Sequence, residues 1–212
     1  ASQGPIESIS QLTSFPTFVD DALDCFLQDA KHSRAYTSRP TDFYLTGIDV
    51  ASWSNGQQRI NIFAYTGPMG GTTLDRGAMT LLYQSPYFNV PGGQAITNYN
   101  FPAPVLIPAG TNYVVEQEKP AGSNLFVIAA TYTSESANSY ITCEQGNTPQ
   151  SYGTLGYSWI SLYQVIYGYS EVPGITIEQT EGLPSGSVFP VGTTTNCFEL
   201  IDKDGNVLDQ CC

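Results

Sequence analysis

The chain has 212 residues, enough for one large domain or for a domain of about 150 residues followed by a smaller module. Its 19 acidic residues outnumber its 7 basic ones, and the net charge of −12 argues against nucleic acid as a partner, because phosphates would be repelled. Apolar runs are much shorter than a membrane span, so no transmembrane segment is expected. The 14 tyrosines, 10 phenylalanines, 20 glycines and 14 prolines favour short strands joined by tight turns.

The first part of the chain gives a weak pattern, and the middle gives a strong one. Residues 1–20 are expected to form an arm, and Val19–Lys31 predicts the one short helix, because acidic residues stand early in it and a lysine late. From residue 41 apolar and polar residues alternate. The predicted strands are 42–51, 59–65, 79–84, 98–106, 112–118, 124–131 and 159–167. A turn at 54–56 separates the first two, and residues 133–157 read as a long polar surface loop. This pattern predicts an all-β, jelly-roll-like β-sandwich.

A boundary is predicted at residues 171–174, where Pro173 and Gly174 interrupt the chain. Beyond it come a strand at 175–179, a loop at 182–186 and a hairpin that turns at Asp204-Gly205. The predicted organisation is therefore an arm with a short helix over 1–35, a sandwich over 36–170, and a small β module over 171–212.

The five cysteines are expected to form disulfides, because their spacing lacks the paired knuckles of a zinc site and the chain has one histidine. Such bridges indicate an oxidising, extracellular compartment. In the C-terminal hairpin, a two-residue turn places Cys212 opposite Cys197, whereas a three-residue loop places Cys211 there. Cys25 and Cys143 would then form the other bridge, and one of the vicinal pair would stay free or bond a neighbouring molecule. The chain opens at Ala1 as a mature, processed protein would.

Two stretches resemble known families. Leu45–Ser52 (LTGIDVAS), Ile60–Gly67 (INIFAYTG) and Pro108–Pro120 (PAGTNYVVEQEKP) resemble strands of jelly-roll domains in large secreted and surface proteins of bacteria. Residues 138–168 resemble the end of such a domain. Residues 175–212, with GLPSGSVFPVGTTT and DKDGN, are similar to the C-terminal half of a hyalin repeat, an immunoglobulin-like adhesion module. The first half of that repeat is missing, and the chain stops where the family continues into one more strand. The resemblance implies a secreted or surface protein concerned with adhesion, and it supplies no catalytic residues.

Candidate catalytic and metal sites are few. The sequence has no GxSxG elbow and no HExxH, and His32 would have to act as the sole general base. No cofactor or metal is expected. Asp202–Asn206 faintly resembles a calcium loop but lacks the distant glutamate, so a hairpin turn is favoured over a metal site.

Carboxylates and aromatic rings leave two further possibilities. A pair for glycoside hydrolysis needs only a suitable separation in space. Its candidates are Asp42, Asp49, Glu116 and Glu118, and each is more simply interpreted as part of a solvated strand face. A platform for sugar rings could be formed by Trp53 and Trp159, with help from tyrosines, although most rings are expected to pack in the core. These tyrosines are Tyr65, Tyr83, Tyr87 and Tyr99.

The favoured function is therefore a non-enzymatic structural or adhesion protein of a bacterial surface or a secreted assembly. Its partners would be other copies of itself or other surface proteins. Strand exchange through the arm or the incomplete C-terminal module would build an assembly such as a filament. The alternative is a carbohydrate-binding module whose partners are surface glycans.

Overall fold

The computed structural model describes residues 2–13, 17–23, 25, 29–122, 127–131, 134–143, 147–172 and 174–212. Over these residues the protein is an all-β sandwich with antiparallel strand pairs, as the sequence predicts. The only helical turn among them is η1 (Arg76–Ala78). The chain forms two compact units, residues 6–168 and residues 1–5 with 169–212. The predicted domain limits stay predictions.

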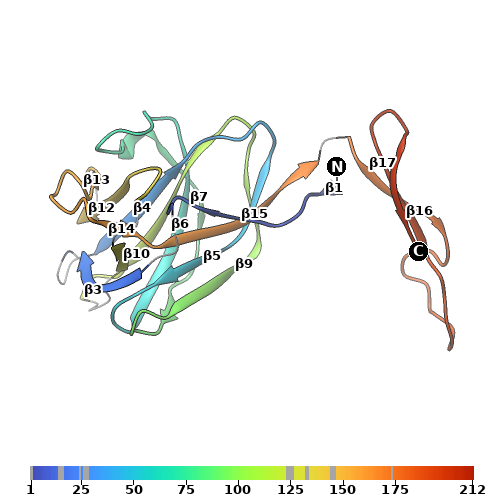
Figure 1. The fold of residues 1–212 in the computed structure, drawn as a ribbon, viewed down its shortest axis with the longest axis horizontal. Coiled ribbons are helices and arrows are strands. Elements are labelled where there is room, and N and C mark those ends of the chain that lie inside the picture. Colours follow the sequence, from blue (N-terminus) through green and yellow to red (C-terminus); the bar gives the residue numbers. More distant parts are fainter. Residues whose placement is uncertain are drawn as a thin grey trace. The chain divides into compact units, whose positions relative to one another are not determined.

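The larger unit packs two main sheets against each other (Figure 1). The first contains β2 (Glu7–Ser10), β15 (Gln164–Val172), β5 (Phe43–Ala51) and β9 (Ile96–Ile107). The second runs in the order β13 (Gln150–Ser151), β12 (Ser139–Cys143), β4 (Ala30–Tyr36), β10 (Asn112–Lys119), β6 (Gly56–Tyr65) and β7 (Met79–Gln84), with β8 (Phe88–Val90) also on β6. A small third sheet contains β14 (Ile160–Leu162), β11 (Val127–Thr131) and β3 (Thr17–Leu23).

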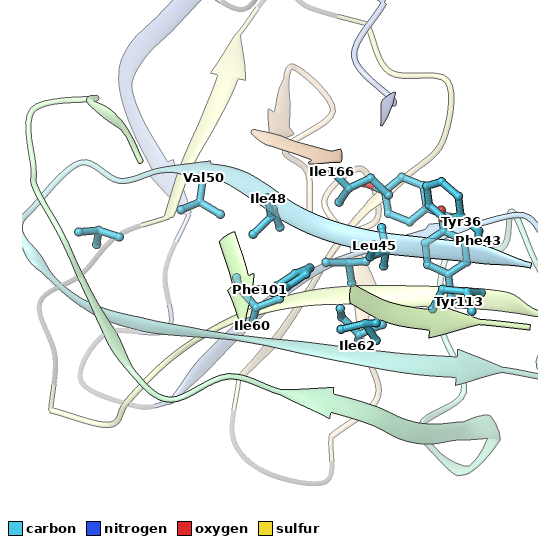
Figure 2. Close-up of a cluster of buried hydrophobic side chains, with 14 residues drawn as sticks. Tyr36, Phe43, Leu45, Ile48, Val50, Ile60, Ile62, Phe101, Tyr113 and Ile166 are labelled. Atoms are coloured by element: carbon cyan, nitrogen blue, oxygen red, sulfur yellow. The ribbon is translucent and has the colours of Figure 1, made fainter. Parts of the chain in front are cut away.

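The main core lies between the first and second sheets (Figure 2). Leu45, Ile48 and Val50 of β5 face Ile60 and Ile62 of β6, and all five side chains are fully buried. Burying an aliphatic side chain of this size contributes about 1.5–3 kcal/mol, so this apolar layer is the main stabilising element of the unit. The alternation seen in the sequence therefore places one side of each strand in the core.

Aromatic rings close one end of this core. The rings of Tyr36 and Tyr113 are stacked with their centroids 5.1 Å apart, and the guanidinium of Arg39 lies 4.1 Å from the ring centroid of Phe43. Both tyrosines are almost completely buried. Burial raises the pKa of each of their hydroxyls well above its usual value. These rings therefore belong to the core and are not a surface platform.

The structure corrects three local expectations. The helix predicted over Val19–Lys31 is absent from the described residues, which form β3 and the start of β4 instead. The arm contributes β1 (Ser2–Gln3) and β2, and both pair with β15 of the same chain. The predicted loop 133–157 contains β12, because Tyr140 and Ile141 are buried in the sheet. In each case pairing with a distant strand overrides a weak local pattern.

The smaller unit contains a separate three-stranded antiparallel sheet of β16 (Thr176–Glu181), β17 (Cys197–Ile201) and β18 (Val207–Cys211). Every residue of β16 and β18 is exposed. Large apolar side chains such as Ile177, Val191 and Leu208 therefore face solvent in this unit. The immunoglobulin-like character of this unit stays a prediction.

Candidate functional site

Charged and amide side chains gather on the outer face of the second sheet, the face turned away from the main core. In β10 the residues alternate, so that Tyr113 and Val115 enter the core while Glu116 and Glu118 point outward. Pairing of β10 with β4 and β6 places Glu118 between Lys31 and Arg59 in one row across the sheet. The next row places Glu116 beside Asn61 of β6, whose other neighbour is Gln84 of β7. Residues far apart in the sequence thus meet on one surface.

Arg59 and Glu118 form a bidentate ion pair. Arg59 donates from Nε to Glu118 Oε2 at 2.9 Å and from Nη2 to Glu118 Oε1 at 2.7 Å. The amide of Asn61 donates to Glu118 Oε2 at 2.7 Å and to Glu116 Oε1 at 3.1 Å. Gln84 Nε2 in turn donates to Asn61 Oδ1 at 2.9 Å. Because planar groups in two-point contact have few alternative orientations, this network is preorganised.

A long connection crosses the outer face and closes one end of it. Residues 66–78, called the strap here, leave β6 and reach the opposite edge of the sheet, where Thr73 pairs with Gln150 of β13. Leu74 of the strap is fully buried against Val114 and Tyr140. This apolar contact holds the strap down and fixes the position of the turn that follows it.

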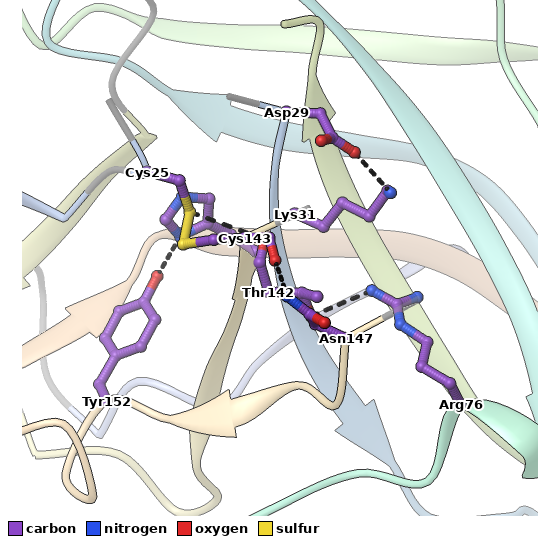
Figure 3. Close-up of a disulfide and its surroundings, with 9 residues drawn as sticks. Cys25, Asp29, Lys31, Arg76, Thr142, Cys143, Asn147 and Tyr152 are labelled. Atoms are coloured by element: carbon purple, nitrogen blue, oxygen red, sulfur yellow. Dashed lines mark hydrogen bonds and ion pairs between the residues drawn. A yellow bond between two sulfur atoms is a disulfide. The ribbon is translucent and has the colours of Figure 1, made fainter. Parts of the chain in front are cut away.

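The turn after Leu74 delivers a third cation. Asp75 caps η1 by accepting a hydrogen bond from the backbone N–H of Gly77 at 2.8 Å. Arg76 then extends over the sheet, where its Nη2 donates to Thr142 Oγ1 at 3.1 Å (Figure 3). The same nitrogen lies 2.6 Å from Glu116 Oε2, an ion-pair contact whose N–H direction is not that of a hydrogen bond. Arg76 therefore neutralises Glu116 from above.

Together these groups line a groove of about 260 Å³ on the outer face, called the outer groove here. Its lining residues are Lys31, Arg59, Asn61, Phe63, Arg76, Leu81, Gln84, Glu116 and Glu118. Leu81 is half exposed and gives the groove an apolar wall. Tyr87 lies beside it, with the guanidinium of Arg59 4.8 Å from the centroid of its ring. The outer groove thus combines fixed polar groups with apolar surface.

The two glutamates are more buried than expected from the sequence. Glu116 is completely buried and Glu118 is 3% exposed, so the expectation of solvated strand faces is wrong for both. Burial by itself would raise the pKa of Glu118, but the hydrogen bonds from Arg59 and Asn61 outweigh it and the pKa is lowered. Glu118 is therefore a carboxylate at neutral pH and has no proton to give to a leaving group.

The other two carboxylates considered in the sequence have structural contacts. Asp49 accepts hydrogen bonds from the hydroxyl of Tyr167 at 2.6 Å and from the amide of Asn98 at 2.8 Å. Asp42 accepts from the backbone N–H of Ala109 at 2.8 Å and so fixes a turn. Neither residue lines the outer groove.

His32 lies on the inner side of β4 and is fully buried. Its Nδ1 shares a 2.6 Å hydrogen bond with the hydroxyl of Tyr152, and burial, helped by the charge of Lys119, lowers its pKa to about 3. Tyr152 points toward the bridge between Cys25 and Cys143 (Figure 3). A neutral imidazole without access to solvent supports the structure of the unit, and no substrate can reach it.

Two disulfides are present. Cys25–Cys143 joins residues 118 apart in the sequence, with their Cα atoms 5.4 Å apart, and Cys197–Cys212 closes the C-terminal hairpin. Cys211 is free and exposed.

The C-terminal hairpin combines the two loop lengths considered for the sequence. The backbone N–H of Asp202 donates to the carbonyl of Asn206, so the loop between them has three residues, which by itself would place Cys211 opposite Cys197. A bulge in β18 then shifts the pairing register by one residue. Cys212 is therefore the partner of Cys197.

The side chain of Asp202 stabilises this turn. Its Oδ1 accepts hydrogen bonds from the backbone N–H groups of Asp204 at 2.9 Å and Asn206 at 2.8 Å. The side-chain amide of Asn206 also donates to Asp202 Oδ2 at 2.9 Å, and this hydrogen bond, with that from the Asn206 backbone N–H, lowers the pKa of Asp202. Within the described ranges, no group of three or more His, Cys, Asp or Glu side chains is placed to hold a metal ion.

The two tryptophans are partly exposed, and they lie outside the outer groove. Trp53 is 39% exposed beside the end of β5, and Trp159 is 51% exposed, with its ring 5.6 Å from that of Tyr157. Among the tyrosines named with them, Tyr65 is buried under the strap and Tyr87 is exposed. A sugar platform on the two tryptophans stays a prediction.

Sequence reasoning named Glu116 and Glu118 but missed the cations of the outer groove. Lys31, Arg59 and Arg76 are three of the seven basic residues of the chain. The sequence contains one signal for these cations. Arg59 and Asn61 alternate with isoleucines, so they share one face of their strand, just as the two glutamates, which alternate with Val115 and Gln117, share one face of theirs. That signal shows that each set shares a face, but not that the two faces adjoin.

Comparisons with known proteins give little further information. No protein-family model matches the chain, and no curated protein matches it. A solved structure of the cysteine protease and lectin-like domains of Cwp84, a surface layer associated protein of Clostridium difficile, is similar at 15% identity and a TM-score of 0.43. The likeness covers 68% of this chain and 33% of that one, so the chain spans about a third of the length of that protein. Among the described residues no helix is long and apolar enough to cross a membrane.

Proposed function

We propose that this chain is an extracellular carbohydrate-binding protein and that its larger unit holds a glycan in the outer groove. The preorganised network of Arg59, Glu118 and Asn61 beside an exposed leucine is the observation that carries the proposal. Sugars present hydroxyl groups at the edges of an otherwise apolar ring. A few fixed donors and acceptors next to apolar surface are therefore the complement that a sugar needs. The two disulfides support an oxidising, extracellular location.

Binding without catalysis is part of the proposal. Glu118 is held as a carboxylate by Arg59 and so cannot serve as the proton donor that glycoside hydrolysis requires, and Arg76 lies 2.6 Å from the buried Glu116 Oε2, between that oxygen and a ligand in the groove. Incubation of a bound oligosaccharide with the protein, followed by mass spectrometry, is expected to return the oligosaccharide intact. The appearance of shortened products would contradict this part of the proposal.

The experiment that tests the function is a screen of the protein against neutral and acidic glycans, followed by titration calorimetry. Leu81→Ala removes the apolar wall of the groove and is expected to weaken binding about tenfold, the worth of one side chain's apolar contact. Leu106→Ala is the matched control, because Leu106 is a similarly exposed leucine, 42% against 50%, in β9 of the other sheet. Failure of every glycan to bind, or equal losses in both variants, would overturn the proposal.

A structural or adhesive role is the second candidate, and the smaller unit favours it. Its sheet exposes Ile177 on β16 and Leu208 on β18, and Cys211 remains a free thiol at its edge. Exposed apolar surface and open strand edges are features of sheets that associate. Sedimentation of the protein over a range of concentrations tests this role, and a strict monomer at all concentrations would remove it.

A further inference from the structure

The polar groups of the outer groove are unequally satisfied. Both oxygens of Glu118 already accept hydrogen bonds, from Arg59 and Asn61, and Glu116 Oε1 accepts one from Asn61. Glu116 Oε2 accepts no hydrogen bond from the described residues, but it is buried, 2.6 Å from Arg76 Nη2, where a ligand cannot reach it. The carboxylate oxygens that a ligand could reach are therefore already used as acceptors inside the protein. A ligand that offers mainly donors, such as an amine, would find few free acceptors in this groove.

The cations keep donors that these contacts do not use. Lys31 Nζ gives one of its three hydrogens to Asp29, at 2.9 Å (Figure 3). Arg59 uses Nε and Nη2 on Glu118, and none of its contacts with described residues is a hydrogen bond from Nη1. Its side chain is 23% exposed and that of Lys31 is 11% exposed, so both reach the groove surface. The unused capacity of the groove is mainly that of positively charged donors.

The position of these cations is also unusual for the chain. The protein carries a net charge of −12, yet three of its seven basic residues line this one groove. Lys31 and Arg59 lie on the two strands that flank β10, so their backbones are two strand spacings apart, roughly 10 Å. The two cations therefore enter the groove from opposite sides of β10, an arrangement that suits a ligand with more than one acceptor-rich group.

From these observations we infer that the outer groove selects acidic oligosaccharides, whose uronate carboxylates are bound by Lys31 and Arg59. This inference rests on the proposed carbohydrate-binding function and narrows it to one class of glycan. Carboxylates accept strong, charge-assisted hydrogen bonds from both kinds of cation. Neutral rings of the same shape would make only the weaker contacts to hydroxyl groups.

The test compares uronate-containing oligosaccharides with the same molecules after reduction of their carboxyl groups to neutral alcohols. The acidic form is expected to bind about tenfold more tightly, as one charge-assisted hydrogen bond would give. Its affinity should fall with added salt, while that of the reduced form should stay constant. If the reduced forms bind equally well or better, the inference is wrong while the proposed function stands. If neither these nor any other glycan binds, the proposed function itself fails.

Two variants with matched controls locate the effect. Gln84→Glu adds a negative charge at the groove, which should repel the carboxylate of the ligand. The affinity for the acidic oligosaccharide is expected to fall about tenfold, while the affinity for the reduced form stays unchanged. Gln57→Glu is its control, because each glutamine donates from Nε2 to an asparagine Oδ1, at 2.9 Å for Gln84 and 3.2 Å for Gln57. Gln57 does not line the groove.

Lys31→Gln removes one of the two cations and should abolish most of the preference for the acidic form. Lys203→Gln, in the exposed turn of the smaller unit, is its control and should change nothing. Thermal unfolding of each variant shows whether the fold is retained. A full preference for the acidic form in folded Lys31→Gln and Gln84→Glu would overturn the assignment to this groove.

Discussion

Removal of Arg59 tests whether the outer groove contains a buried ion pair. In Arg59→Met the carboxylate of Glu118, whose side chain is 4% exposed, keeps the hydrogen bond from Asn61 but loses both bonds from the guanidinium. Breaking one side of a buried pair costs about 3–5 kcal/mol, because the remaining charge is left without a partner. The side chain of Arg59 is 23% exposed, so water can replace part of the contact, and the lower end of that range, about 3 kcal/mol, is expected.

The assay is urea unfolding at neutral pH, extended to a double-mutant cycle. Glu118→Gln in the background of Arg59→Met should restore most of the lost stability, because the buried carboxylate that lost its counterion is then replaced by a neutral amide. Arg39→Met is the control, since Arg39 pairs with Glu7 at a more exposed position, and its cost should not exceed about 1 kcal/mol. A loss below that of the control, or a coupling energy near zero, would show that water solvates Glu118 and would refute the reasoning.

The same pair predicts a direction for the pH dependence. The pKa of Glu118 is lowered in the folded protein, so its contribution to stability is present above the pKa of the unfolded carboxyl, about 4.3. That contribution is lost as the pH falls through the lower folded pKa. In Arg59→Met the burial remains without the guanidinium, so the difference in stability from the wild type should be largest at neutral pH and should shrink in acid. An unchanged difference between pH 7 and pH 3 would contradict this account.

Two further predictions concern the cysteines. Replacement of Cys25 and Cys143 by serine opens a loop of 118 residues and should lower the free energy of unfolding by up to about 5 kcal/mol, measured by thermal or urea unfolding; a change below about 1 kcal/mol would contradict the bridge. In Cys212→Ser, Cys211 should form a bridge with Cys197. Loss of the bulge in β18 would slip that strand by one residue, and β18 tolerates the slip because all of its residues are exposed. Non-reducing peptide mapping checks the second prediction, and two free thiols in that variant would refute it.

Strands were predictable where one face of the strand is apolar. The alternation over 42–51, 59–65 and 112–118 predicts strands that the structure contains as β5, β6 and β10. β4 was missed, because both of its faces are covered. Its residues from His32 to Tyr36 are all buried, and they include Arg34, whose guanidinium donates to the carbonyl of Leu162 at 2.8 and 3.1 Å. A buried arginine in a polar segment carries no periodic apolar signal.

The order of the strands was not predictable from local pattern. β5 and β6 follow each other in the sequence with a turn between them, yet they pair with different strands and belong to opposite sheets. β10 instead lies between β4 and β6. The outer groove depends on this non-sequential order, because only that order sets Glu118 between Lys31 and Arg59. Local periodicity determines which face a side chain occupies, and long-range pairing determines which side chains meet there.

Stability alone does not explain the charged groups of the outer groove. A buried ion pair contributes little or nothing compared with well-packed apolar residues of the same size, because both charges must first lose their water. The chain is only 12% charged, yet it buries Glu116 and Glu118 and positions Arg76 over Glu116 by means of the strap. The neighbouring part of the same face, around Leu74 and Val114, shows that an apolar solution is available on this sheet. The charged network is therefore better explained by binding, because hydrogen-bond donors with fixed orientations select a ligand in a way that apolar packing cannot.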